Sequence, residues 1–92
     1  ESMFGRVFHY RDNVGLEIDA IIHLHDGRWG AIEIKLGSDE IPEAISNLKR
    51  LVAKINTDRM KEPSFLMVLT ATKYAYKDES GVWIVPIGCL KP

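Results

Sequence analysis

Hydrophobic and polar residues alternate along two stretches in the first half of the chain, at 16–24 and 28–36. In a β-strand successive side chains point to opposite faces, so an alternation with a period of two predicts a strand with unlike faces. The Asp26-Gly27 pair between the stretches is typical of a hairpin turn. The pattern therefore predicts an antiparallel hairpin, preceded by a shorter strand at residues 6–11 and a cluster of turn-forming residues at 12–15.

The length of the hairpin turn decides which charged side chains share a face. A two-residue turn would put Asp19 and Glu33 on opposite faces. A three-residue turn, with Gly27 in the left-handed conformation, places Asp19 directly opposite Glu33 and Glu17 opposite Lys35. We predict the three-residue turn, because it leaves one face of the hairpin wholly apolar and gathers the charged side chains on the other.

After residue 40 the hydrophobic residues take the spacing of a helix. Ser38 and Asp39 are suitable caps and Pro42 is tolerated in a first turn, so we expect a helix over residues 40–56 that ends near 56–57. Residues 65–69 are apolar without alternation, as in a strand covered on both faces, and residues 82–87 predict a last strand. The expected apolar stripe of the helix consists of Ile41, Ala44, Ile45, Leu48, Leu51, Val52 and Ile55.

The order strand, strand, strand, helix, strand, strand predicts a mixed β-sheet of four or five strands with one packed helix, in the α+β or α/β class. The 92 residues permit a single domain, 1–92, and 46% hydrophobic residues suffice for a core. No run approaches the roughly 18 apolar residues of a membrane span, and no secretory signal opens the chain. The single cysteine excludes an internal disulfide framework and suits a reducing compartment. We therefore expect a cytoplasmic protein without membrane contact.

Asp19, Glu33 and Lys35 are the candidate catalytic residues of the hairpin. Mg²⁺ prefers carboxylate oxygens and water and usually takes one or two carboxylates from a protein, so Asp19 and Glu33 are candidate ligands for Mg²⁺ or Mn²⁺. Such a cation polarises a phosphodiester and acidifies bound water, while the Lys35 ammonium offsets charge in the transition state. The alternative is a solvated sheet face, on which opposite charges across the ladder contribute roughly 0.2–1 kcal/mol each.

The polar face of the expected helix carries a further set of cationic residues, Lys49, Arg50 and Lys54. They are candidates for holding a nucleic-acid backbone, and the alternative is the wet side of an amphipathic helix. The formal net charge of −1 gives no overall attraction to nucleic acid, so any contact with DNA or RNA has to be local.

Two other groups surround the candidate site. Arg11 lies near Glu17 in the expected fold, either as a structural pair or as an anchor that supports the site. His23 and His25 alternate with the acidic residues of the same strand, which raises the possibility of a transition-metal site. Two histidines near a turn are more often surface residues.

The pattern of acidic strand residue, hairpin and Glu-x-Lys resembles the PD-(D/E)XK nuclease superfamily, with Asp19, Glu33 and Lys35 at the matching positions. The finer resemblance is to a C-terminal domain of unassigned function found in many prokaryotic AAA+ ATPases, and it covers nearly all of the chain. The motifs that carry it are Tyr10-Arg11-Asp12, Glu17-Ile18-Asp19, Ala31-Ile32-Glu33-Ile34-Lys35 and the closing segment at 76–78 and 81–87.

The resemblance implies a restriction-endonuclease-like fold without its leading helix, and a C-terminal fragment of a larger ATPase whose N-terminal ATPase domain is the partner in the same chain. It also implies Mg-dependent phosphodiester hydrolysis, or nucleic-acid binding, with DNA or RNA as partner. Ile18 stands where the superfamily has the proline that names it, and the acidic residue of the leading helix has no counterpart here. These departures leave open an inactive protein-interaction or regulatory module that keeps the nuclease fold.

Overall fold

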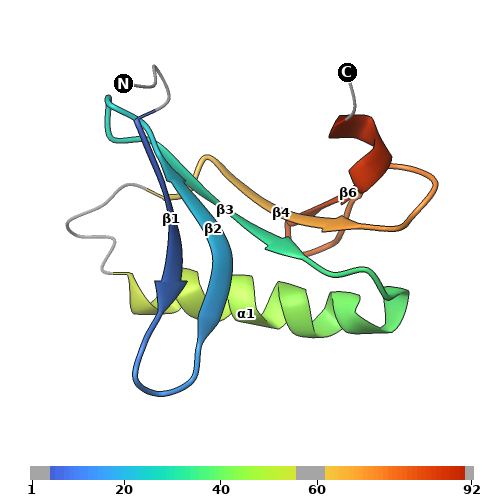
Figure 1. Ribbon diagram of the computed structural model, residues 1–92, viewed down its shortest axis with the longest axis horizontal. Coiled ribbons are helices and arrows are strands. Elements are labelled where there is room, and N and C mark those ends of the chain that lie inside the picture. Colours follow the sequence, from blue (N-terminus) through green and yellow to red (C-terminus); the bar gives the residue numbers. More distant parts are fainter. Residues whose placement is uncertain (1–4, 56–61, 91–92) are drawn as a thin grey trace.

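The computed structural model describes residues 5–55 and 62–90, which form one mixed sheet and one long helix (Figure 1). The helix α1 (Ile41–Lys54) follows a short 3₁₀ helix, η1 (Ser38–Glu40), and a second 3₁₀ helix, η2 (Ile87–Leu90), closes the described chain. The strands are β1 (Arg6–Arg11), β2 (Glu17–His23), β3 (Trp29–Ile34), β4 (Phe65–Thr70), β5 (Tyr76–Lys77) and β6 (Trp83–Pro86).

The strands lie side by side in the order β1-β2-β3-β4-β6-β5. β1, β2 and β3 are antiparallel neighbours, whereas β4 runs parallel to both β3 and β6. The sheet-plus-helix fold and the parallel crossover through α1 are confirmed. The sheet has six strands instead of the expected four or five, partly because the two residues of β5 pair with β6.

The turn between β2 and β3 has the predicted three-residue form. The Leu24 N–H donates to the Arg28 carbonyl at 2.8 Å, and the Gly27 N–H donates to the Leu24 carbonyl at 3.1 Å. Gly27 has a φ of 93°, a left-handed conformation that only glycine adopts without strain. The resulting register pairs Ala20 with Ile32. Next to this pair the two candidate metal ligands, Asp19 and Glu33, come into contact.

β2 also contains a bulge that the alternation did not predict. Phe8 pairs with Ile21 and Tyr10 pairs with Ile18. One residue of β1 therefore lies opposite two residues of β2, so the extra residue of the bulge is Asp19 or Ala20. A bulge shifts the alternation by one residue, so Ile18 and Ile21 both enter the core. Bulges often re-aim a side chain next to a functional site, and this one lies at the candidate ligand.

α1 packs on the face of the sheet that carries Glu33. Trp29, Ala31 and Glu33 alternate along β3 and are at most 2% exposed, whereas Ile34, on the other face, is 49% exposed. Figure 1 shows α1 passing behind β1 and β2, and it contacts β2, β3 and β4. The expectation of one wholly apolar and one charged face is therefore wrong, because Glu33 shares its face with the core.

The apolar stripe of α1 is confirmed, with Leu48 and Leu51 fully buried and Ile45, Val52 and Ile55 partly buried against the core. Its start differs from the prediction. α1 begins at Ile41 with Glu40 as its N-cap residue, and no side chain makes a capping hydrogen bond there. Ser38 and Asp39 lie instead in η1, where the Glu40 carboxylate accepts a hydrogen bond from the Gly37 N–H at 3.3 Å. The expected helix end near 56–57 lies outside the described residues.

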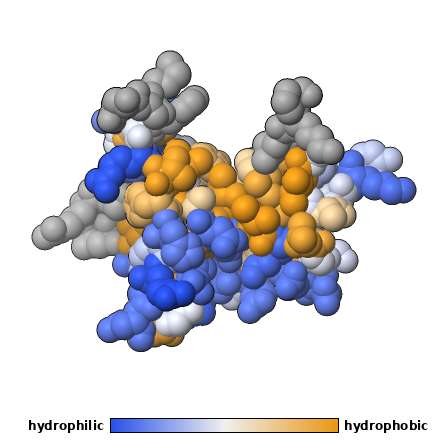
Figure 2. All heavy atoms as spheres, viewed as in Figure 1, coloured by the Kyte–Doolittle hydropathy of each residue, from blue (hydrophilic) through white to orange (hydrophobic). Residues whose placement is uncertain are grey.

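The face of the sheet opposite α1 is partly open. Val7, Ile34 and Trp83 lie on it and are between 41% and 66% exposed. Figure 2 shows hydrophobic atoms gathering over the middle of the sheet, with hydrophilic atoms below them along α1. β4 is buried on both faces only in its second half, since its first three residues, at 65–67, are half-buried.

Candidate functional site

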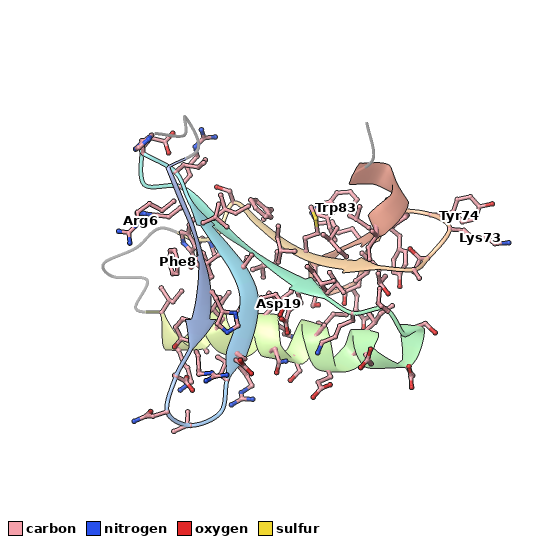
Figure 3. All side chains as sticks on the ribbon, viewed as in Figure 1. Arg6, Phe8, Asp19, Lys73, Tyr74 and Trp83 are labelled. Carbon is pink, nitrogen blue, oxygen red and sulfur yellow. The ribbon has the colours of Figure 1, made fainter. Side chains whose placement is uncertain are left out.

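The backbone ladder between β2 and β3 is replaced by side-chain contacts at Asp19 and Glu33. The Asp19 N–H donates to Glu33 Oε1 at 3.2 Å, and the Ile34 N–H donates to Asp19 Oδ2 at 2.8 Å. The Lys35 N–H instead donates to the Leu69 carbonyl in β4 at 2.9 Å. At this point β3 keeps its backbone hydrogen bonds to β4 but no longer pairs with the backbone of β2. The carboxylates of Asp19 and Glu33 form the hydrogen bonds between β2 and β3 instead. Figure 3 shows Asp19 near the centre of the molecule, above α1.

Glu33 is the buried acid of this pair, with 2% of its surface exposed. Burial raises the pKa of Glu33 above its ordinary value, and the neighbouring Asp19 carboxylate raises it further, while hydrogen bonds from Asn47 and from the Asp19 N–H oppose the shift. Asn47 Nδ2 donates to Glu33 Oε2 at 3.1 Å. Both oxygens of Glu33 therefore have a protein donor, which fixes the orientation of the carboxylate.

A cleft of about 310 Å³ opens beside this pair, between β2, β3 and α1. Lys35 and Arg50 are the two cationic residues in it, and within the described residues neither makes an ion pair. Four carboxylates share the lining with them, so the cleft as a whole favours a cation. The lining residues are Gly15, Glu17, Asp19, Glu33, Lys35, Glu43, Asn47 and Arg50.

Glu17 and Arg11, the two predicted supporting residues, lie at the outer rim of the cleft. Arg11 Nη2 contacts Glu17 Oε2 at 2.9 Å, and His9 Nε2 contacts the same oxygen at 3.2 Å. The hydrogen bonds from Arg11 and His9 hold the pKa of Glu17 below its ordinary value. Glu17 is thus a half-exposed, ionised residue whose charge is already compensated by Arg11, which makes it a weaker candidate for a cation ligand than Asp19.

The three helical cations do not act as one group. Arg50 lines the cleft, whereas Lys49 is exposed and lies outside it. Lys54 Nζ instead forms an ion pair with Asp12 Oδ2 at 3.1 Å, and this contact ties the β1–β2 turn to the helix. Although burial opposes the shift, hydrogen bonds from Lys54 and from backbone N–H groups lower the pKa of Asp12.

Sequence reasoning missed two of the three residues that α1 adds to the cleft, Glu43 and Asn47. With Arg50 they follow the spacing i, i+4 and i+7, which places three polar side chains on one face of a helix. This polar stripe was visible in the sequence. What the sequence did not show is that the stripe faces the hairpin carboxylates.

The donor set of the cleft fits a hard divalent cation. Asp19 and Glu33 offer carboxylate oxygens, and Mg²⁺ or Mn²⁺ needs only one or two of them if water and a phosphate complete the shell. Among residues 5–55 and 62–90, no group of three or more His, Cys, Asp or Glu side chains is placed to hold a metal. His23 lines a separate apolar pocket, so the alternative transition-metal site is not formed in this part of the chain.

Comparison with protein families matches residues 2–90 to a family described as Domain of unknown function (DUF4143). Comparison with curated proteins and with solved structures gives no match. In the described part of the chain, no helix has the length and apolar character to cross a membrane.

Proposed function

The chain belongs to the DUF4143 family, and we propose that its cleft is a divalent-cation site of the PD-(D/E)XK nuclease type that hydrolyses, or at least holds, a nucleic-acid phosphodiester. One observation carries the proposal. Asp19 and Glu33, distant in sequence, are in direct contact where β2 and β3 part, and Lys35, two residues after Glu33, lines the same cleft. We further propose that the domain works within a prokaryotic AAA+ ATPase in the cytoplasm.

Each side chain has a separate task in this proposal. Asp19 and Glu33 would hold Mg²⁺ or Mn²⁺, which supplies a Lewis acid for the phosphodiester and lowers the pKa of bound water. The Lys35 ammonium offsets negative charge that develops on the phosphate in the transition state. Asn47 positions Glu33, and Arg50 binds a neighbouring phosphate of the backbone.

The net negative charge of the cleft implies that the proposed function depends on the divalent cation. Even with the charge of Glu17 compensated by Arg11, three further carboxylates face two cationic side chains, so the cleft alone repels a phosphodiester. Nucleic-acid binding at this site should therefore require the divalent cation, and cleavage should require it as well.

A second candidate function is a protein-interaction or regulatory module without catalysis. The open apolar face of the sheet, with Val7, Ile34 and Trp83 exposed, favours it, since exposed apolar patches often mark contacts with other proteins. Within residues 5–55 and 62–90, no third acid of the cleft is placed to join Asp19 and Glu33 as a cation ligand, which also favours this alternative.

Replacing Lys35 with alanine should abolish cleavage while sparing cation binding, because the ammonium acts on the phosphate and is not a ligand. The measurement is nicking of supercoiled DNA and cutting of RNA by the natural polypeptide that contains this chain, with Mg²⁺ or Mn²⁺ and with a chelator. Lys73→Ala is the matched control, since Lys73 is exposed in the β4–β5 loop and lies far from Asp19 (Figure 3). Cleavage that survives in Lys35→Ala would contradict the catalytic assignment. A cation-bound wild type that cuts neither DNA nor RNA would favour the interaction module.

A further inference from the structure

β1 is an edge strand of the sheet. In the described part of the chain it pairs with β2 alone, so one side of its backbone carries hydrogen-bonding groups without a strand partner. Its residues are mostly exposed, with Val7 at 66% and Phe8 at 42%. Such an edge is a template on which an extended peptide can add as a further strand.

A pocket of about 450 Å³ lies directly beside this edge, on the face of the sheet where α1 ends. This volume is within the range of ordinary ligand sites and accommodates a large apolar side chain with its neighbours. β1 contributes alternate residues to the wall, as expected where an added strand would direct alternate side chains into the pocket. The lining residues are Arg6, Phe8, Tyr10, Ile21, His23, Trp29 and Ile55.

The polar groups of the pocket are cationic or neutral. Within the described residues, the Arg6 guanidinium makes no ion pair, and His23 makes no hydrogen bond through its ring. Arg11, the other arginine of β1, is already compensated by Glu17, which also contacts His9. An apolar pocket whose wall holds an arginine without an ion pair among the described residues is complementary to a large apolar side chain that has a carboxylate nearby.

We propose that the free edge of β1 and the adjacent pocket form a docking site for an extended acidic segment of a partner protein, with a phenylalanine or similar apolar side chain in the pocket and an aspartate or glutamate on Arg6. The site is separate from the nuclease-like cleft. Figure 3 places Arg6 and Phe8 together on the outer side of β1, apart from Asp19. The two sites therefore do not compete for the same residues.

A fluorescence titration tests this proposal, because Trp29 lines the pocket and Trp83 is the only other tryptophan. In a Trp83→Phe background, a capped peptide Thr-Asp-Thr-Phe-Thr-Val, which puts Asp, Phe and Val on one side of a strand, should change the Trp29 emission saturably. It should also slow hydrogen exchange of the β1 amides that do not bond to β2. No saturable change at millimolar peptide would overturn the proposal.

Exchanging the charges of Arg6 and of the peptide tests whether the peptide binds specifically at this site. Arg6→Glu should weaken the peptide about tenfold, and a peptide with lysine in place of aspartate should regain that loss on the variant. Lys73→Glu is the matched control, since it changes the net charge equally at the far end of the molecule (Figure 3). Equal weakening by Arg6→Glu and Lys73→Glu would show a general charge effect and overturn the docking site. The arginines of β1 would then only protect the edge from aggregation.

Discussion

Glu33→Gln is expected to abolish cation-dependent cleavage and, at the same time, to raise the melting temperature at neutral pH. The carboxylate is buried, so its ionised form destabilises the folded state at neutral pH, and a neutral amide of the same shape removes that cost. The hydrogen bonds can be kept, because Asn47 can turn its amide so that its oxygen accepts from glutamine. The measurements are thermal melting and a cleavage assay on the same preparation.

The pH dependence of this stability difference follows from the raised pKa of Glu33. The folded chain binds the proton more tightly than the unfolded chain, so the protonated carboxyl contributes full stability below 4.5, its ordinary pKa. That contribution is lost as the pH rises through the higher pKa of the folded state. The advantage of Glu33→Gln should therefore shrink as the pH falls towards 4.5. Asp39→Asn, in the exposed η1, is the control, and a Glu33→Gln protein that melts below wild type at every pH would contradict the assigned environment.

Leu48→Ala is expected to cost about 2–5 kcal/mol of stability, because Leu48 is fully buried between α1 and the sheet. A domain of this size has a free energy of unfolding of roughly 5–14 kcal/mol. Each kcal/mol lost lowers the melting temperature by about 4–8 °C, so the variant should melt at least about 8 °C below wild type. The loss should appear in chemical denaturation as a lower midpoint with an unchanged slope.

Ser46→Ala on the exposed side of the same helix is the matched control for Leu48→Ala, and it should leave the free energy of unfolding within about 0.5 kcal/mol of wild type. A Leu48→Ala cost below about 1 kcal/mol would show that α1 does not pack on the sheet through this stripe. The cleft would then lose the wall that carries Asn47 and Arg50.

The register of the hairpin was predictable because two independent local signals agreed. Gly27 allows the left-handed residue of a three-residue turn, and the apolar alternation favours the same pairing, although the face it marked as wholly apolar is not the one that α1 covers. The helix stripe was predictable for a similar reason, since a period of 3.6 residues is a local property of the sequence.

The side of the sheet that α1 covers could not be read from the alternation. Alternation shows that Ala31 and Glu33 share a face, but not that this face becomes the core. The bulge at 19–20 was equally hidden, because one extra residue in β2 has no sequence signal of its own. The roles of Asn47 and Lys54 also could not be predicted, because each comes from a contact between distant segments. Asn47 contacts Glu33 and Lys54 contacts Asp12, and no local sequence pattern specifies either partner.

The central claim is that Asp19 and Glu33 share one divalent cation, and calorimetric titration of Mn²⁺ or Mg²⁺ tests it most directly. Wild type should bind about one cation per chain, and Asp19→Asn should lose that binding while it keeps the fold, since an amide replaces one carboxylate without a change of shape. Asp39→Asn, outside the cleft, should bind the cation as wild type does. Equal binding by wild type and Asp19→Asn, or no binding by wild type at millimolar cation, would contradict the claim.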